Sequence, residues 1–278
     1  MFVDAYGADW LDGLHRRDAE LSSGTRLVCV IDGAFRPGVY RAYRAALAAD
    51  NQPILLFERL PSCSDETRDV SPFVFRFESG NVRLRELLAG CSAMPMLSVV
   101  ATYETAAAIG ERLAAWCVVE AGDQRFNFRF PDTRRLPAIF RALTPRQRGQ
   151  MLGRSIAWHY IDRAGRWQAL ACEASGEALA VADRPILSDA QFGLLVDDSA
   201  ADEMSVSVQD MAPHGSHLPS VRHAVLSKAL RVAALASADE VTTMRWCAAC
   251  VSSGLVLEDD EMAVHFAEWR QARERHIA

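Results

Sequence analysis

The feature that most constrains the fold of this chain is an uninterrupted apolar run, Leu27–Ile31, near the N-terminus. A half-exposed strand alternates polar and apolar residues, whereas a continuous run is typical of a strand whose sheet is covered on both faces. The run ends at Asp32-Gly33, a pair typical of a tight turn. The sequence therefore predicts a strand over residues 26–31 that lies inside a covered sheet.

Strand and helix patterns then alternate along the next 140 residues. Apolar stripes at helical spacing, a proline in a first turn and Gly90 after a last turn indicate helices, while short β-branched and aromatic runs indicate strands. We expect strands at 54–58, 73–77, 96–101, 117–120, 125–130, 156–161 and 167–171, and helices at 37–49, 82–88, 104–115, 136–143 and 146–152. This interleaving predicts an α/β domain, a mixed sheet with flanking helices, over residues 1–180.

The character of the chain changes after about residue 180. Asp183-Arg184-Pro185 resembles a linker, and no strong strand pattern follows it. Two apolar stripes at helical spacing follow, the first from Val221 to Val232 and the second from Met262 to Trp269. The sequence therefore predicts an all-helical C-terminal region over residues 181–278.

Composition and charge restrict the classes of function. The 278 residues carry a net charge of -6, which argues against a general nucleic-acid binder because phosphate contacts need a basic face. No apolar run of about 18 residues indicates a membrane span, and no basic segment precedes an apolar one at the N-terminus. The seven scattered cysteines are typical of reduced, buried thiols. We expect a cytoplasmic protein without nucleic-acid or membrane partners.

One short motif indicates chemistry. The segment Trp246-Cys247-Ala248-Ala249-Cys250 resembles a thioredoxin-like redox site, although it lies among predicted helices rather than in a βαβ unit. His214 and His217 lie about thirty residues upstream, and two imidazoles with two thiolates could bind zinc tetrahedrally. Packing is the favoured interpretation of the two cysteines. A thiol- or zinc-dependent enzyme centred on Cys247 and Cys250 remains the alternative.

Other catalytic motifs do not match. The segment Gly153-Arg154-Ser155-Ile156-Ala157 lacks the second glycine of a hydrolase elbow, and a single glycine follows the first strand where a dinucleotide-binding loop needs three. We therefore expect a binding protein with no catalytic residue and no cofactor.

Three segments, taken in order, resemble a known family. They are Val28–Ala34, Ser71–Phe75 and Met96–Trp158, and the last contains the block Phe128-Arg129-Phe130-Pro131-Asp132-Thr133-Arg134. Together they are similar, over about residues 26–170, to the type VI secretion effector chaperones, also called Tap or adaptor proteins. In that family the order within the block is Asp-Pro, whereas here it is Pro131-Asp132.

The resemblance implies a cytoplasmic chaperone that binds one secreted effector protein and helps load it onto a VgrG spike protein, with no cofactor. It points to Asp32, Gly33, Arg129, Asp132 and Trp158 as family-block or interface candidates. We expect the Arg129 guanidinium to fork onto the Asp132 carboxylate as an internal brace, with a partner contact as the alternative. A core position is favoured for Trp158. An immunity-type protein that binds a toxin is a further alternative, and the helical region is the predicted contact for the client.

Overall fold

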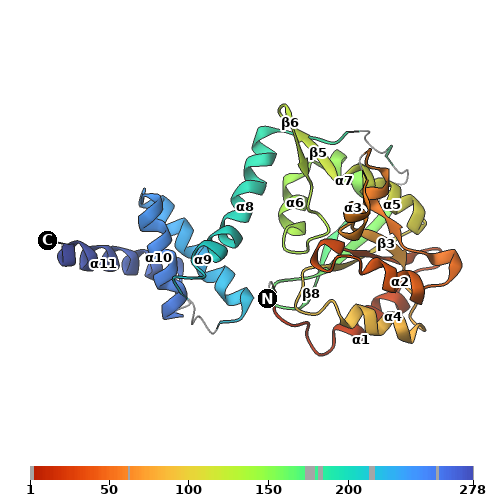
Figure 1. Cartoon of the computed structure of the whole chain (residues 1–278), viewed down its shortest axis with the longest axis horizontal. Coiled ribbons are helices and arrows are strands. Elements are labelled where there is room, and N and C mark those ends of the chain that lie inside the picture. The colour runs from red at the N-terminus through yellow and green to blue at the C-terminus, as the bar shows by residue number, and fades with distance from the viewer. Residues whose placement is uncertain are drawn as a thin grey trace. The chain divides into compact units, whose positions relative to one another are not determined.

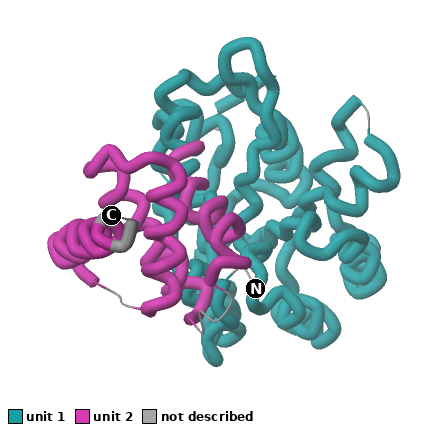
Figure 2. The backbone as a smooth tube through the Cα atoms, turned by 60° about the vertical axis from the view of Figure 1, so that its left-hand side comes forward, with its two compact units in different colours: residues 1–195 teal, residues 196–278 magenta. Residues whose placement is uncertain are grey.

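A computed structural model describes residues 3–61, 63–172, 179–180, 184–212, 217–254 and 257–277. The chain forms two compact units, residues 1–195 and residues 196–278, which Figure 2 colours separately. We describe each unit by itself.

The first unit is built on a six-stranded sheet in the order β2-β3-β1-β4-β7-β8. Every neighbouring pair of its strands is antiparallel. The strands are β1 (Arg26–Ile31), β2 (Ile54–Leu55), β3 (Phe73–Arg76), β4 (Leu97–Thr102), β7 (Ser155–Ile161) and β8 (Trp167–Ala171). The apolar run thus forms a central strand, as its sequence predicts.

Side chains from β1 enter two separate cores, one on each face of the sheet. Val28 and Val30 belong to the first core, while Leu27, Cys29 and Ile31 belong to the second. This alternation explains why the run has no polar position, since both faces are dry. The prediction that the sheet is covered on both faces is confirmed.

Helices supply both covers (Figure 1). The first core receives α5 (Ala106–Ala115), α6 (Leu136–Ala142) and α7 (Pro145–Leu152), and the second receives α1 (Trp10–Ala19), α2 (Tyr40–Ala46) and α4 (Val82–Ala89). The capping signals of α7 are complete: the Thr144 hydroxyl accepts the Gln147 N–H, and the Gln147 side chain accepts the Thr144 N–H. Such a capping box satisfies two otherwise unpaired donors.

A smaller sheet lies on the first core, in the order β6-β5-β9. Strands β5 (Val118–Ala121) and β6 (Gln124–Asn127) form the predicted hairpin, and β9 (Ile186–Leu187) pairs with β5 in parallel. The expectation of no strand after residue 180 is therefore wrong. Two residues are too few to show a period, and β9 is fixed by long-range contacts, including the bond from the Glu120 N–H to the Pro185 carbonyl.

Several other segments of the first unit differ from the prediction; the expected strand 125–130 ends at Asn127, and the expected helix 37–49 covers only Tyr40–Ala46. The prediction missed helix α1, which fully buries only Gly13 and Leu14, although Trp10 and Leu11 also pack against the second core. The short helix α3 (Asp65–Asp69) buries no residue at all. The expected strand 54–58 ends at Leu55 and continues as a 3-10 helix, Leu56–Arg59.

From residue 189 onward the described part of the C-terminal region is helical, as the sequence predicts. Helix α8 (Asp189–Ser207) crosses the boundary between the units, and α9 (Pro219–Leu235), α10 (Glu240–Ser253) and α11 (Asp259–Ile277) follow. The core of the second unit includes Val225, Ala229 and Val232 from α9, Trp246 from α10 and Phe266 from α11. Within the described residues, none of the helices has the length and apolar character needed to cross a membrane.

Candidate functional site

A charged cluster forms where β1 ends. The Asp32 carboxylate begins a 3-10 helix, Gly33–Phe35, by accepting the Ala34 N–H at 3.0 Å through Oδ1. Its Oδ2 accepts a hydrogen bond from Arg129 Nη2 at 2.8 Å. The Asp32 side chain is only 2% exposed, whereas that of Arg129 is 41% exposed. Burial raises the pKa of Asp32, and the Arg129 guanidinium opposes that shift.

The second carboxylate of the cluster, Asp132, is held mainly by Arg134. Arg134 donates from Nε to Oδ1 at 3.0 Å and from Nη2 to Oδ2 at 2.7 Å, which is a bidentate fork. Arg129 Nη2 lies 3.9 Å from the same carboxylate. The expected fork of Arg129 onto Asp132 is therefore wrong. Asp32, 97 residues away in sequence, provides a closer acceptor for Arg129.

Gly33 allows the chain to pass closely over a neighbouring loop. A Cβ at this position would lie 2.3 Å from the carbonyl oxygen of Ser71, a distance that real side chains do not tolerate. The Ser71 hydroxyl accepts the Phe57 N–H at 3.0 Å and donates to the Pro72 carbonyl at 2.8 Å. The three family-like segments thus come together at one place, through Gly33, Ser71 and the 128–134 block.

An aromatic ring completes the cluster. The Phe35 ring lies 5.6 Å from the guanidinium carbon of Arg129 and 5.6 Å from that of Arg134, both at cation–π distance. Together with Ala34, Asp132 and Arg135, these side chains line a polar hollow of about 410 Å³. The arrangement can present the Arg129 guanidinium and the partly exposed Phe35 ring to a partner while both buried carboxylates stay paired.

Trp158 lies in the core of the first unit. Its side chain is fully buried and its indole Nε1 donates to the Ser98 hydroxyl at 2.9 Å. The rings of Phe130 and Phe140 approach it edge-on, at 6.1 Å and 6.3 Å between centroids. This position agrees with the core interpretation of Trp158 and separates it from the surface cluster.

The cysteine pair faces the interior of the second unit. Cys247 and Cys250 are 0% and 4% exposed, and Cys250 Sγ lies 3.9 Å from the sulfur of Met262. Burial raises the pKa of each thiol to about 12. These are packing contacts in an apolar core.

The predicted zinc ligands are not brought together where the structure can be described. His217 Nε2 lies 2.3 Å from the point where a Cβ on Gly254 would sit, and His214 falls outside the described residues. Within the described ranges, no three potential metal-ligating side chains gather.

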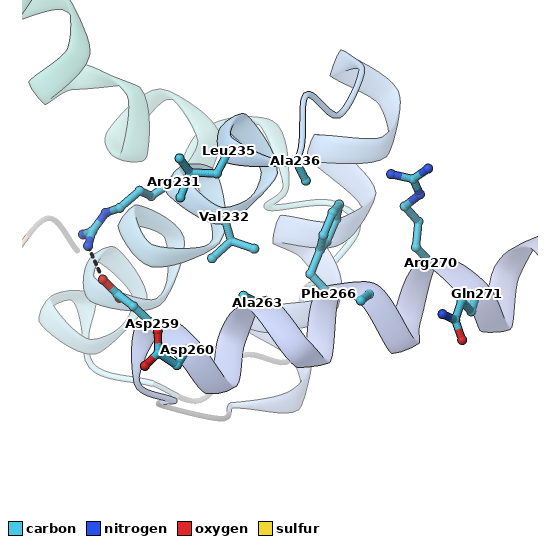
Figure 3. A pocket seen from close by; sticks show the side chains of 11 residues that line it. Arg231, Val232, Leu235, Ala236, Asp259, Asp260, Ala263, Phe266, Arg270 and Gln271 are labelled. Carbon is cyan, nitrogen blue, oxygen red and sulfur yellow. Dashed lines mark hydrogen bonds and ion pairs between the residues drawn. The ribbon is translucent and has the colours of Figure 1, made fainter.

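A second candidate surface is a groove of about 620 Å³ between α9 and α11 (Figure 3). No pattern in the sequence predicts this groove. Its lining residues are Arg231, Val232, Leu235, Ala236, Asp259, Asp260, Ala263, Phe266, Ala267, Arg270 and Gln271. Val232 and Phe266 belong to the predicted apolar stripes, but the exposed Leu235 lies just beyond the end of the first stripe. Leu235, an apolar residue next to the predicted stripe, is the feature of the sequence that could have indicated this groove.

Comparison with known proteins gives one match. Residues 29–150 match the family model described as a domain of unknown function, DUF4123. The match contains the whole charged cluster and ends before Trp158 and before the second unit. No curated protein and no solved structure matches the chain.

Proposed function

We propose that this protein is a cytoplasmic chaperone, or adaptor, that binds a type VI secretion effector and helps load it onto a VgrG spike protein. One observation carries the proposal: the DUF4123 match over residues 29–150 covers most of the segments that resemble the effector chaperones. Asp32, Gly33, Arg129 and Asp132 all lie inside it.

The charged cluster supports a binding role. Its two carboxylates are buried and paired, so they are held in place rather than available as an acid and a base. Arg129 remains 41% exposed beside the Phe35 ring. Arginine and aromatic side chains are enriched in the residues that dominate protein–protein interfaces. The cluster therefore has the chemistry of a contact surface on a rigid support.

The burial of the cysteines weighs against the rival thiol enzyme. The thiolate is the reactive form, and with a pKa of about 12 roughly one Cys247 thiol in 10⁵ would be ionised at neutral pH. An activated cysteine instead lies in an electropositive, accessible environment. The buried pair stabilises the core of the second unit in this proposal.

Co-expression tests the proposal directly. The full-length chain, carrying an affinity tag, is expressed with the effector and the VgrG protein encoded beside it. We expect the effector to co-purify with the chain, and removal of the chain from the producing cell to reduce effector delivery. Failure of both proteins to co-purify would refute an adaptor role.

A protection assay separates the adaptor from an immunity-type protein. The effector is expressed in a host with or without the chain, and survival is compared. An adaptor increases delivery from the producing cell without protecting the target cell. Full protection without any effect on delivery would favour the immunity alternative instead.

A further inference from the structure

We infer that the groove between α9 and α11 is the docking site for an amphipathic helix of the effector, with a basic residue beside its apolar face. This inference rests on the proposed function: it names the surface that would bind the effector and the kind of effector segment that would bind there. The groove lies entirely within the second unit, outside the residues that match the family model.

The walls of the groove are apolar and partly uncovered. Val232 and Phe266 form its base and are 5% and 3% exposed. Leu235, at the end of α9, is 82% exposed, more than any other large apolar residue described as exposed. An apolar side chain from a partner would remove Leu235 from water and continue a core that Val232 and Phe266 already begin.

The spacing of the lining residues favours a helix as the occupant. Those on α11 recur every three or four positions, from Asp260 through Ala263 and Ala267 to Gln271, and so lie along one helix face. The eleven steps from first to last span about 16 Å, or three turns. Ala263 and Ala267, with Ala236 opposite, leave room for close backbone approach. A three-turn helix with apolar residues at i, i+3 or i+4, and i+7 matches this face.

The charges at one end of the groove define the flank of that helix. Arg231 and Asp259 form an ion pair there, so these two charges compensate each other (Figure 3). Asp260 follows in the acidic first turn of α11, and the Asp260 side chain is exposed. A lysine or arginine on the partner would complement the Asp260 carboxylate and would not compete with the existing pair. At this end of the groove the charge therefore favours a basic flank, whereas Arg270 lines the groove ten residues further along α11.

Peptide binding to the full-length chain tests the groove without the effector. The probe is a synthetic fourteen-residue helix with leucines along one face and lysines beside them, and the matched peptide carries glutamates in place of lysines. Fluorescence anisotropy measures both. We expect the lysine peptide to bind at least tenfold more tightly, Leu235→Gln to weaken its binding at least tenfold, and Asp260→Lys to reverse the preference. Equal binding of both peptides by the wild type would overturn the charge assignment.

A matched substitution outside the groove tests whether replacing any exposed apolar residue in the second unit weakens peptide binding. Val206 on α8 is 73% exposed in the second unit and does not line the groove, so Val206→Gln should leave peptide binding within twofold of the wild type. Glutamine favours the helix about as well as leucine, and circular dichroism verifies that both variants fold. A similar loss in Val206→Gln and Leu235→Gln would overturn the groove as the site.

Co-purification with the effector then separates two failures. If the effector binds the wild type and Leu235→Gln equally, the groove assignment is wrong while the adaptor role stands. If the effector does not bind the wild type at all, the proposed function fails, and the effector helix fails with it. A concentration-dependent dimer of the wild type that Leu235→Gln abolishes would instead identify a second copy of the chain as the occupant.

Discussion

The buried bond between Trp158 and Ser98 offers a direct test of how the first unit is held together. Trp158→Phe keeps an aromatic ring in the core but removes the indole N–H that donates to the Ser98 hydroxyl at 2.9 Å. Ser98 is 0% exposed, so water cannot replace the lost donor. Ser98→Ala makes the reciprocal change, because it removes the acceptor and leaves the indole N–H buried. The two variants together remove the bond from both sides.

The expected magnitude follows from these contacts. Leaving a buried hydroxyl without its donor costs about 1–3 kcal/mol, and the smaller ring adds about 1 kcal/mol for the cavity beside Phe130 and Phe140. We therefore expect Trp158→Phe to lower the free energy of unfolding by about 2–4 kcal/mol. Ser98→Ala should cost about 1–3 kcal/mol. The double variant should cost less than the sum by about 1–2 kcal/mol, since no polar group is left unpaired.

Urea unfolding followed by far-UV circular dichroism measures all four proteins, because the signal does not depend on the tryptophan that is removed. Strictly additive costs would show that the bond contributes nothing and would refute this account of the core. Effector binding by folded Trp158→Phe should equal that of the wild type, since a fully buried side chain touches no partner. A selective loss of effector binding in a stably folded Trp158→Phe variant would instead indicate that Trp158 contributes to the interface.

Three further predictions concern other buried groups. Burial lowers the pKa of His159 to about 4, so between pH 6.5 and 4 the unfolded chain takes up a proton that the folded chain does not. The free energy of unfolding should therefore fall by about 1 kcal/mol over this range, a value discounted for the partial exposure of His159. Urea titrations at several pH values should show a smaller fall in His159→Gln. Thiol titration of the native protein should modify the partly exposed Cys63 well before the buried Cys247, and equal rates would contradict the packing interpretation. Gly33→Ala should cost about 1–3 kcal/mol in thermal unfolding because its Cβ meets the Ser71 carbonyl, and an unchanged melting temperature would show that the loop can yield.

The elements that the sequence predicts well are those whose own residues determine them. Residues 26–31 are apolar at each position after the first, and such a run has few alternatives to a covered strand. Helix α7 has its capping box at Thr144 and Gln147, within one turn of the chain. Local signals of this kind need no knowledge of the rest of the fold.

The elements that the sequence does not predict depend on distant partners. Helix α1 packs Trp10, Leu11 and Leu14 on the second core, and the Trp167 indole donates to the Trp10 carbonyl, 157 residues away. Strand β9 is two residues long and exists because β5 lies beside it. The apolar positions of α1 span only about one turn and β9 is too short to show a period, so distant contacts determine both elements.

The candidate site divides in the same way. Asp32 and Arg129 can be singled out from their motifs, but their direct ion pair joins positions 97 residues apart, and nothing in either motif specifies it. The groove is even harder to predict from the sequence, because its lining comes from two helices that only the fold brings together. Sequence patterns identify which residues are unusual, while the fold determines which of them meet.

The swapped Pro131-Asp132 order has a physical account in this cluster. In this chain Asp132 fixes the turn before α6: the Asp132 carboxylate accepts the Arg134 N–H at 3.0 Å, and its carbonyl accepts the Arg135 N–H at 2.9 Å. Pro131 is buried and donates no N–H, so the exchange leaves no unpaired donor at that position. Because Asp132 retains Arg134, Arg129 is left for Asp32 and for the surface. Asp132 is therefore braced by Arg134, while the guanidinium of Arg129 pairs with Asp32 and stays partly exposed, as a partner contact would require.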